Sequence, residues 1–255
     1  HIRFANQTRY KKMWRMQMYM FVGVDLAWSR NNETGVAVLS DDDTPAVVRT
    51  ASVVDDDDIV GCVPDKTELF AVDAPLVVPN EEGQRPAEDE LRPVYSEFNA
   101  GPYPANRNWL ERVCGEVRGE TLVDELAQLG FEHNPSVDTS VNRGIIEVYP
   151  HPAMVALFEL DTVIPYKKRK NRSKEDIVGA LRTYYDYLCE DTAIQRETLP
   201  DFELSTEDTW RAIKGFEDVL DGVLSAYVAW YLWRNPEEAR VFGNRDEGYI
   251  TSPRL

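Results

Sequence analysis

Three acidic residues interrupt apolar stretches that have the composition of β-strands. Asp25 lies in FVGVDLAWS, Asp73 in FAVDAPL and Glu147 in IIEVYPHP, each near the carboxyl end of its stretch. One acid in such a place commonly caps a turn or a helix. Three together indicate a shared site, because carboxylates that repel one another gather inside a protein mainly where a cation compensates them.

Two more acids open an apolar helix near the end of the chain. In residues 216–232, FEDVLDGVLSAYVAWYL, Asp218 and Asp221 are three residues apart and share one face. That face continues through the small residues Gly222, Ser225, Ala226 and Ala229. Small side chains let a helix approach a sheet closely, so we expect this stripe to carry both aspartates towards Asp25. The alternative is that the acids only complement the helix dipole, a stabilisation of about 0.3–1 kcal/mol.

The five acids offer only oxygen atoms as ligands, and no histidine or cysteine stands at metal-ligand spacing beside them. Oxygen ligands favour Mg²⁺ or Mn²⁺ over Zn²⁺. Two such ions, about 4 Å apart, can activate a water and stabilise the leaving oxygen in phosphodiester hydrolysis. We expect Asp25, Asp73 and Asp221 to bind the metal, and Asp218 to act less directly. The predicted catalytic residues are Asp25, Asp73, Glu147, Asp218 and Asp221.

A basic run stands out in a chain whose formal net charge is −17. Residues 166–174, YKKRKNRSK, contain six basic residues and no acid, and could cradle a phosphate backbone. The alternative is a solvated loop. The predicted nucleic-acid-binding residues are Lys167, Lys168, Arg169, Lys170 and Arg172. His151, in YPHP, could act as a base near the metals, but we favour a helix-start residue bonded to the backbone.

Apolar stretches with strand character position these acids. Residues 20–27, 35–40 and 46–54 are joined by short connections, which predicts an antiparallel meander. Residues 68–74 and 143–149 predict two further strands, which intervening helices would make parallel. The predicted helices cover residues 109–130, 151–160, 174–190 with Ser173 as N-cap, 205–214 and, after a break at Gly215, 216–232. The fold class is therefore α/β, with three antiparallel strands, two parallel strands and flanking helices.

The charge is unevenly distributed along the chain. Residues 1–19 hold five Lys or Arg and no acid, so the remaining residues carry −17 − 5 = −22. We interpret residues 1–19 as a tag remnant or an upstream extension, and residues 20–255 as one domain with a long insertion at 75–108. Such acidity is typical of a salt-in halophile, where molar salt screens self-repulsion. Three separated cysteines and the lack of an 18-residue apolar stretch predict a reducing, cytoplasmic location without a membrane span.

Several segments in one order suggest a family. The segments are GVDLAW, TGVAV, AVDAPL, EVYPHPA, YKK, EDVLDGVLSAY and a final GYI–SP, and they cover roughly residues 20–253. Together they resemble domain-of-unknown-function family 429, a family of predicted nucleases with an RNase H-like fold, in a haloarchaeal-type member. The resemblance implies a β-meander, two further strands and flanking helices. It also implies that Asp25 and Asp73 are the acids of the first and fourth strands. Asp218 and Asp221 would be the C-terminal helix acids, with a spacing similar to that of RuvC-type resolvases, and Glu147 matches the family's EVYP segment.

Three functions are compatible with these patterns. The leading hypothesis is a Mg²⁺- or Mn²⁺-dependent nuclease. The same core fold also serves actin-like and sugar-kinase-type ATPases, although their phosphate-binding hairpin usually carries a glycine-rich turn and the turn here, SRNNETG, has only Gly35. The third possibility is a protein that binds nucleic acid without cleaving it. The sequence leaves open which nucleic acid is bound and which oligomer forms.

Overall fold

The computed structural model describes residues 19–41, 44–137, 139 and 143–255. Apart from Tyr19, the basic segment 1–19 lies outside these ranges, so its predicted role as a tag remnant or extension stays a prediction.

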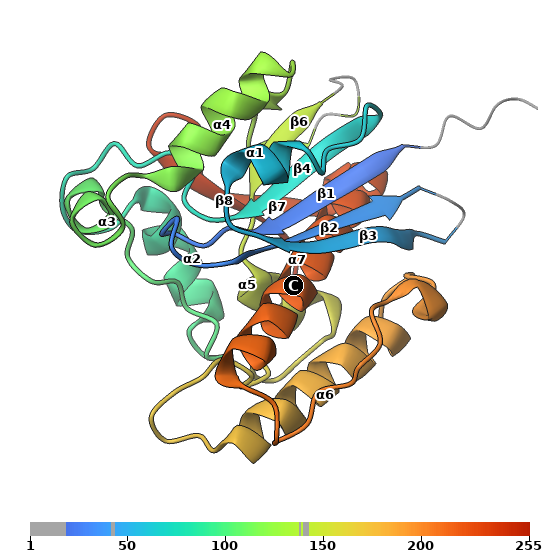
Figure 1. Cartoon of the computed structure of the whole chain (residues 1–255). Coiled ribbons are helices and arrows are strands. Elements are labelled where there is room, and N and C mark those ends of the chain that lie inside the picture. Colours follow the sequence, from blue (N-terminus) through green and yellow to red (C-terminus); the bar gives the residue numbers. More distant parts are fainter. Residues whose placement is uncertain (1–18, 42–43, 138, 140–142) are drawn as a thin grey trace, which may run out of the picture.

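A six-stranded mixed sheet forms the centre of the molecule (Figure 1), in the strand order β3-β2-β1-β4-β6-β5. The strands β1 (Met20–Asp25), β2 (Thr34–Ser40) and β3 (Ala46–Val53) form the predicted antiparallel meander. On the other side of β1 lie β4 (Thr67–Asp73) and β6 (Gly144–Glu147), which run parallel to β1. The predicted α/β class and mixed sheet are confirmed, and they are compatible with an RNase H-like core.

One further strand was not expected from the sequence. β5 (Glu132–His133) pairs in parallel with β6 at the edge of the sheet. Two residues are too few to show the alternation of apolar and polar side chains by which a strand is recognised in a sequence.

Helices cover both faces of the sheet, because the central strands are apolar on both sides. On one face, α1 (Asp56–Val60) and α4 (Arg118–Gln128) pack over β-strand residues that include Val22, Val24 and Phe70. On the other face, α6 (Lys174–Glu190) and α7 (Trp210–Arg234) pack over Phe21, Ala71 and their neighbours. Figure 1 shows α7 directly beneath the sheet and α6 outside it.

The remaining elements are short. The insertion at 75–108 contains α2 (Pro86–Tyr95), and α3 (Arg107–Cys114) begins at its end. α5 (Pro150–Leu157) follows β6, and single 3-10 turns lie at Arg196–Thr198 and Pro236–Glu238. A hairpin of β7 (Ala239–Asn244) and β8 (Gly248–Pro253) ends the fold.

Three predicted helix boundaries were wrong. The helix predicted at 109–130 is divided into α3 and α4, because Gly115 adopts a left-handed φ of 92° that ends α3. The break predicted at Gly215 is absent, and so is the predicted helix start at residue 205. Helix α7 runs from Trp210 to Arg234, and its N-cap is Thr209. A glycine inside a helix costs only about 1 kcal/mol relative to alanine, which the packing of a buried 25-residue helix offsets. The predicted N-cap Ser173 is confirmed, since its Oγ accepts from Asp176 N at 3.1 Å.

Helix α7 lies unusually close to β1 and β2. A methyl group added at Gly23 would overlap the backbone of Ala226 and Gly222, and one added at Gly35 would overlap the backbone of Asp218. The predicted docking of the small-residue stripe on the sheet is therefore confirmed. Within the described ranges, no helix combines the length and apolarity needed to cross a membrane.

Candidate active site

The three strand acids end at one edge of the sheet. Asp25 and Asp73 are the last residues of the adjacent parallel strands β1 and β4, and they stand opposite each other in register. Glu147, the last residue of β6, pairs with Val72 one position earlier. Parallel neighbours must end at the same edge, so the topology that the sequence predicts also predicts this grouping.

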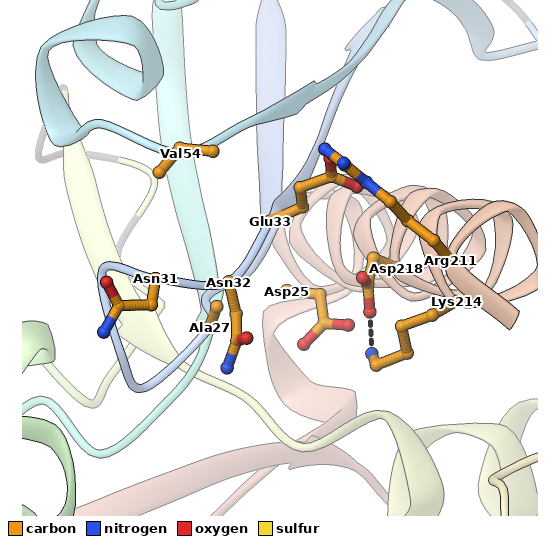
Figure 2. A pocket seen from close by; sticks show the side chains of 9 residues that line it. All are labelled: Asp25, Ala27, Asn31, Asn32, Glu33, Val54, Arg211, Lys214 and Asp218. Carbon is orange, nitrogen blue, oxygen red and sulfur yellow. Dashed lines mark hydrogen bonds and ion pairs between the residues drawn. The ribbon is translucent and has the colours of Figure 1, made fainter.

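Helix α7 brings its acids to the same edge. Asp218 and Asp221 are buried, with 3% and 0% of their surfaces exposed. In Figure 2, Asp25 from β1 and Asp218 from α7 project into one cavity, whose other wall includes Asn32 and Glu33. The cavity has a volume of about 550 Å³. The acids of β1 and α7 therefore meet at a space that is open to a ligand.

A buried arginine fixes the chain that follows Asp25. Arg118 donates to the carbonyl oxygen of Ala27 at 2.8 Å and forms an ion pair of 2.6 Å with Asp56. Ala27 lines the cavity. Arg118 thus joins the start of α4 to the β1–β2 connection and to α1, and holds one wall of the cavity in place.

Two lysines compensate the α7 acids. Lys167 Nζ lies 2.6 Å from Asp221 Oδ2 and 3.0 Å from Glu217 Oε1. Lys214 Nζ lies 3.2 Å from Glu217 Oε1 and also pairs with Asp218, a contact drawn in Figure 2. The sequence analysis missed Lys214 and Glu217. Lys214 lies four residues before Asp218 and Glu217 four residues before Asp221, which places both on the acidic face of the helix.

Burial raises the pKa of two carboxyl groups of the site, those of Asp73 and Asp218. Burial raises the pKa of Asp73 well above its ordinary value, the charge of Asp25 raises it further, and Lys167 opposes the change. Burial and Asp25 also raise the pKa of Asp218, to about 8, against the pull of Lys214. Near neutral pH the site therefore retains protons that a cation could displace. The Oδ2 atom of Asp25 is buried and has no hydrogen-bond partner within the described residues.

Asp221 is engaged on both oxygens. Its Oδ1 accepts from the Tyr166 hydroxyl at 2.8 Å, and its Oδ2 accepts from Lys167. Asp218 rather than Asp221 projects into the cavity beside Asp25. The expectation that Asp221 binds an ion directly stays a prediction, and it requires Lys167 to leave its oxygen.

Glu147 is paired with an arginine. Arg85 contacts its two oxygens at 2.6 Å and 2.9 Å, and Leu76 N donates to Oε2 at 2.8 Å. Burial raises the pKa of Glu147 to about 7, although Arg85 opposes the change. These contacts join β6 to the chain that follows β4 and to the start of α2. They give no support to the predicted catalytic role of Glu147.

The basic run has members of two kinds. Lys167 faces the acids of α7, as described above, whereas Lys168, Arg169 and Lys170 are exposed. Lys168 Nζ lies 4.0 Å from the centroid of the Trp210 ring, and Arg169 Nη2 donates to the Tyr103 hydroxyl at 3.2 Å. Arg172 donates to the carbonyl oxygen of Lys167 at 2.8 Å. The exposed residues remain candidates for phosphate contacts, while Lys167 is part of the carboxylate site.

His151 is the second residue of α5, and its ring lies beside the site. Its Nδ1 is 3.0 Å from the Tyr149 hydroxyl, so its partner is a side chain and not the backbone bond that we favoured. Burial and the nearby Lys167 lower the pKa of His151 to about 4. The ring is therefore neutral at pH 7.

Comparison with known proteins identifies a family without a characterised activity. The family model "Protein of unknown function (DUF429)" matches residues 23–247. The chain belongs to the DUF429 family. No curated protein and no solved structure matches it.

The carboxylate oxygens of this DUF429 site fit some of the ligand positions of a hard divalent cation. The described residues hold no ready-made cluster of three metal ligands. Asp25, Asp73 and Asp218 nevertheless provide oxygen donors at one edge, and one of them has a buried oxygen without a partner. An ion such as Mg²⁺ takes one or two carboxylates and completes its shell with water or phosphate, so Asp25 with Asp73 or Asp218 would suffice.

Proposed function

We propose that this DUF429 protein is a Mg²⁺- or Mn²⁺-dependent nuclease that hydrolyses phosphodiester bonds in nucleic acid. One observation carries the proposal: Asp25 stands opposite Asp73 in register, beside Asp218, with a buried oxygen that lacks a partner. A carboxylate in this state is stabilised by a cation. The cavity of about 550 Å³ in front of it leaves room for a substrate.

In this proposal Asp25, Asp73 and Asp218 hold the ion. The ion, when bound, supplies a Lewis acid and lowers the pKa of a water. Asp218, whose pKa is about 8, would release its proton to solvent on binding a cation. Lys167 and Lys214 neutralise Glu217 and Asp221, so the acids do not repel the phosphate that must approach. Arg118 keeps the β1–β2 connection open beside the acids.

The test is cleavage of single-stranded, hybrid and branched substrates in high KCl with Mg²⁺ or Mn²⁺. Asp25→Asn should lower the rate by more than about a hundredfold, since even outer partners of metal ligands contribute 10–100-fold. Glu33→Gln is the matched control, because Glu33 lines the same cavity but pairs with Arg211 at its rim. If the parent protein cleaves no faster than the Asp25→Asn variant, the proposal is wrong.

A second candidate is a protein that binds nucleic acid without catalysis. The observation in its favour is that Lys167 and Lys214 already compensate acids of α7. Calorimetric titration with Mn²⁺ separates the two functions. The nuclease should release heat on binding Mn²⁺, and Asp25→Asn should abolish this heat. A protein that binds nucleic acid but shows no heat with Mn²⁺ would have the second function.

We further propose that the protein acts in the cytoplasm of a halophile and that its partner is nucleic acid. The three separated cysteines and the formal charge of −17 support the location. The exposed cations Lys168, Arg169 and Lys170 support the partner.

A further inference from the structure

Lys167, which pairs with Asp221, also lines a second cavity. It has a volume of about 410 Å³, which is within the usual range of about 300–1,000 Å³ for small-ligand sites. His151 from α5 lines it, together with the loop that connects α5 to α6 and Asn99 from the connection after α2. The cavity is distinct from the one in Figure 2, which Asp25 and Asp218 line.

The side chains around this cavity favour an anion. Lys167, Arg169 and Arg172 line it, and none of the described residues that line it is acidic. Lys167 is paired with acids of α7, but within the described ranges neither arginine forms an ion pair. Their guanidinium groups are therefore available to an anionic ligand at a cavity without acidic side chains among the described residues. Guanidinium groups offer two parallel N–H donors to the oxygens of a phosphate.

One side of the cavity is closed by hydrogen bonds between its walls. Val163 N donates to the carbonyl oxygen of Phe98 at 2.8 Å, and Asn99 Nδ2 donates to Thr162 Oγ1 at 3.0 Å. These bonds tie the α5–α6 loop to the connection after α2. A cavity that is closed on one side suits the end of a strand better than a strand that passes through it.

We propose that this cavity, here called the end pocket, binds the terminal phosphate of a nucleic-acid strand. The assignment of the ligand to nucleic acid rests on the proposed nuclease function. Lys167 lines the end pocket and contacts Asp221 at 2.6 Å, so the bound end would lie one side chain away from the carboxylate site. The substrate class is then a strand with a phosphorylated end, cleaved close to that end.

The experiment measures binding to labelled oligonucleotides of one sequence that end in a 5′-phosphate, a 3′-phosphate or only hydroxyl groups. It is done in EDTA, so that no metal is needed. One phosphorylated form should bind about tenfold more tightly than the hydroxyl form, the ratio that one charge-assisted hydrogen bond of about 1.4 kcal/mol produces. The form that binds more tightly shows whether the pocket takes the 5′ or the 3′ end of a strand. Inorganic phosphate should displace that oligonucleotide.

Two variants test whether the preference arises in the end pocket or from general attraction between the basic loop and nucleic acid. Arg169→Gln and Lys170→Gln each remove one exposed charge from the same loop, but only Arg169 lines the end pocket. Arg169→Gln should reduce the tenfold preference to about one. Lys170→Gln should weaken all three oligonucleotides alike and keep the preference. Equal binding of the three oligonucleotides by the parent protein, or equal loss of preference in both variants, would overturn the proposal. A retained preference without Mn²⁺-dependent cleavage would overturn the nuclease function alone.

Discussion

Lys167 and Lys214 explain how so many acids share one edge of the sheet. Five carboxyl groups, those of Asp25, Asp73 and three residues of α7, lie around two ammonium groups. Burial alone would lower the pKa of Lys167, but Asp221, Asp25 and Glu217 raise it well above its ordinary value. Lys167 therefore stays charged near neutral pH.

Lys167→Met should destabilise the protein in EDTA, because it leaves Asp221 buried without its cation. The expected loss is about 1–3 kcal/mol, less than for a fully buried pair because the Lys167 side chain is 32% exposed. Mn²⁺ should restore stability if Asp221 then binds the ion. Adding Asp221→Asn should restore stability without Mn²⁺. Denaturant unfolding with and without Mn²⁺ measures these effects, and equal stability of Lys167→Met and the parent would contradict the role of the pair.

The pKa of Asp218 predicts how stability depends on pH in the absence of metal. An acid whose pKa is raised by folding, here from an ordinary value near 3.8 to about 8, holds its proton more firmly in the folded than in the unfolded state. Stability should therefore fall as pH rises between these two values, by at most about 1.4 kcal/mol per pH unit for this group. Asp218→Asn should lack this contribution. The free energy of unfolding from pH 5 to 8 tests it, and identical slopes for variant and parent would refute it.

At the scale of elements, the position of α7 decides the geometry of the site. The helix approaches β1 and β2 over two glycines, Gly23 and Gly35, whose places no larger residue can take without moving the backbone. Gly222, on the helix, is less constrained: an added methyl would lie 3.1 Å from Gly35 O. Alanine at this position needs a shift of only a few tenths of an ångström.

Gly23→Ala should therefore cost about 3 kcal/mol or more, and it should impair Mn²⁺ binding because it moves Asp218 away from Asp25. The matched control is Gly179→Ala, on the exposed face of α6, where an added methyl meets nothing. There the replacement should stabilise the protein by about 0.5–1 kcal/mol. Thermal unfolding of both variants measures the difference. A Gly23→Ala variant as stable as the parent would show that α7 does not need this close approach.

The helices and strands could be predicted from the sequence where the spacing of apolar residues followed a single pattern. The five main strands follow from apolar stretches bounded by turn residues, and the edge position of Asp25 and Asp73 follows from parallel pairing. Glycine was harder to interpret. Gly115 ends a helix and Gly215 does not, because the first adopts a positive φ and the second lies in a helix held by tertiary packing.

The contacts of the site could not be predicted in the same way. Lys167 was predicted to bind nucleic acid as part of the basic run, yet its nearest charges come from α7, more than forty residues later in the sequence. The pairing of Arg85 with Glu147 joins segments that are 62 residues apart. Such pairs depend on how loops pack, and no local pattern records this. The orientation of Asp218 rather than Asp221 towards the cavity depends on the rotation of α7, which spacing alone leaves open.

For the whole molecule, charge is the dominant property. A formal charge of −17 on 255 residues destabilises the compact state through repulsion at low ionic strength. Raising KCl from 0.1 M to 1 M shortens the Debye length from about 10 Å to about 3 Å. The Tm should therefore rise over this range, and replacing several exposed aspartates by asparagine should flatten the dependence. A Tm that does not change with KCl would argue against adaptation to a salty cytoplasm.

The pairing of β1 with α7 also sets when the protein can first act. Asp25 and Asp218 are separated by 218 − 25 = 193 positions, and synthesis proceeds at about 5–20 residues per second. About 10–40 s therefore pass between the synthesis of the first acid and that of its partner. Throughout that interval the nascent chain carries strand acids without the helix that completes their site. The nuclease proposed above would therefore stay inactive on the ribosome, where it is surrounded by RNA, until most of its chain exists.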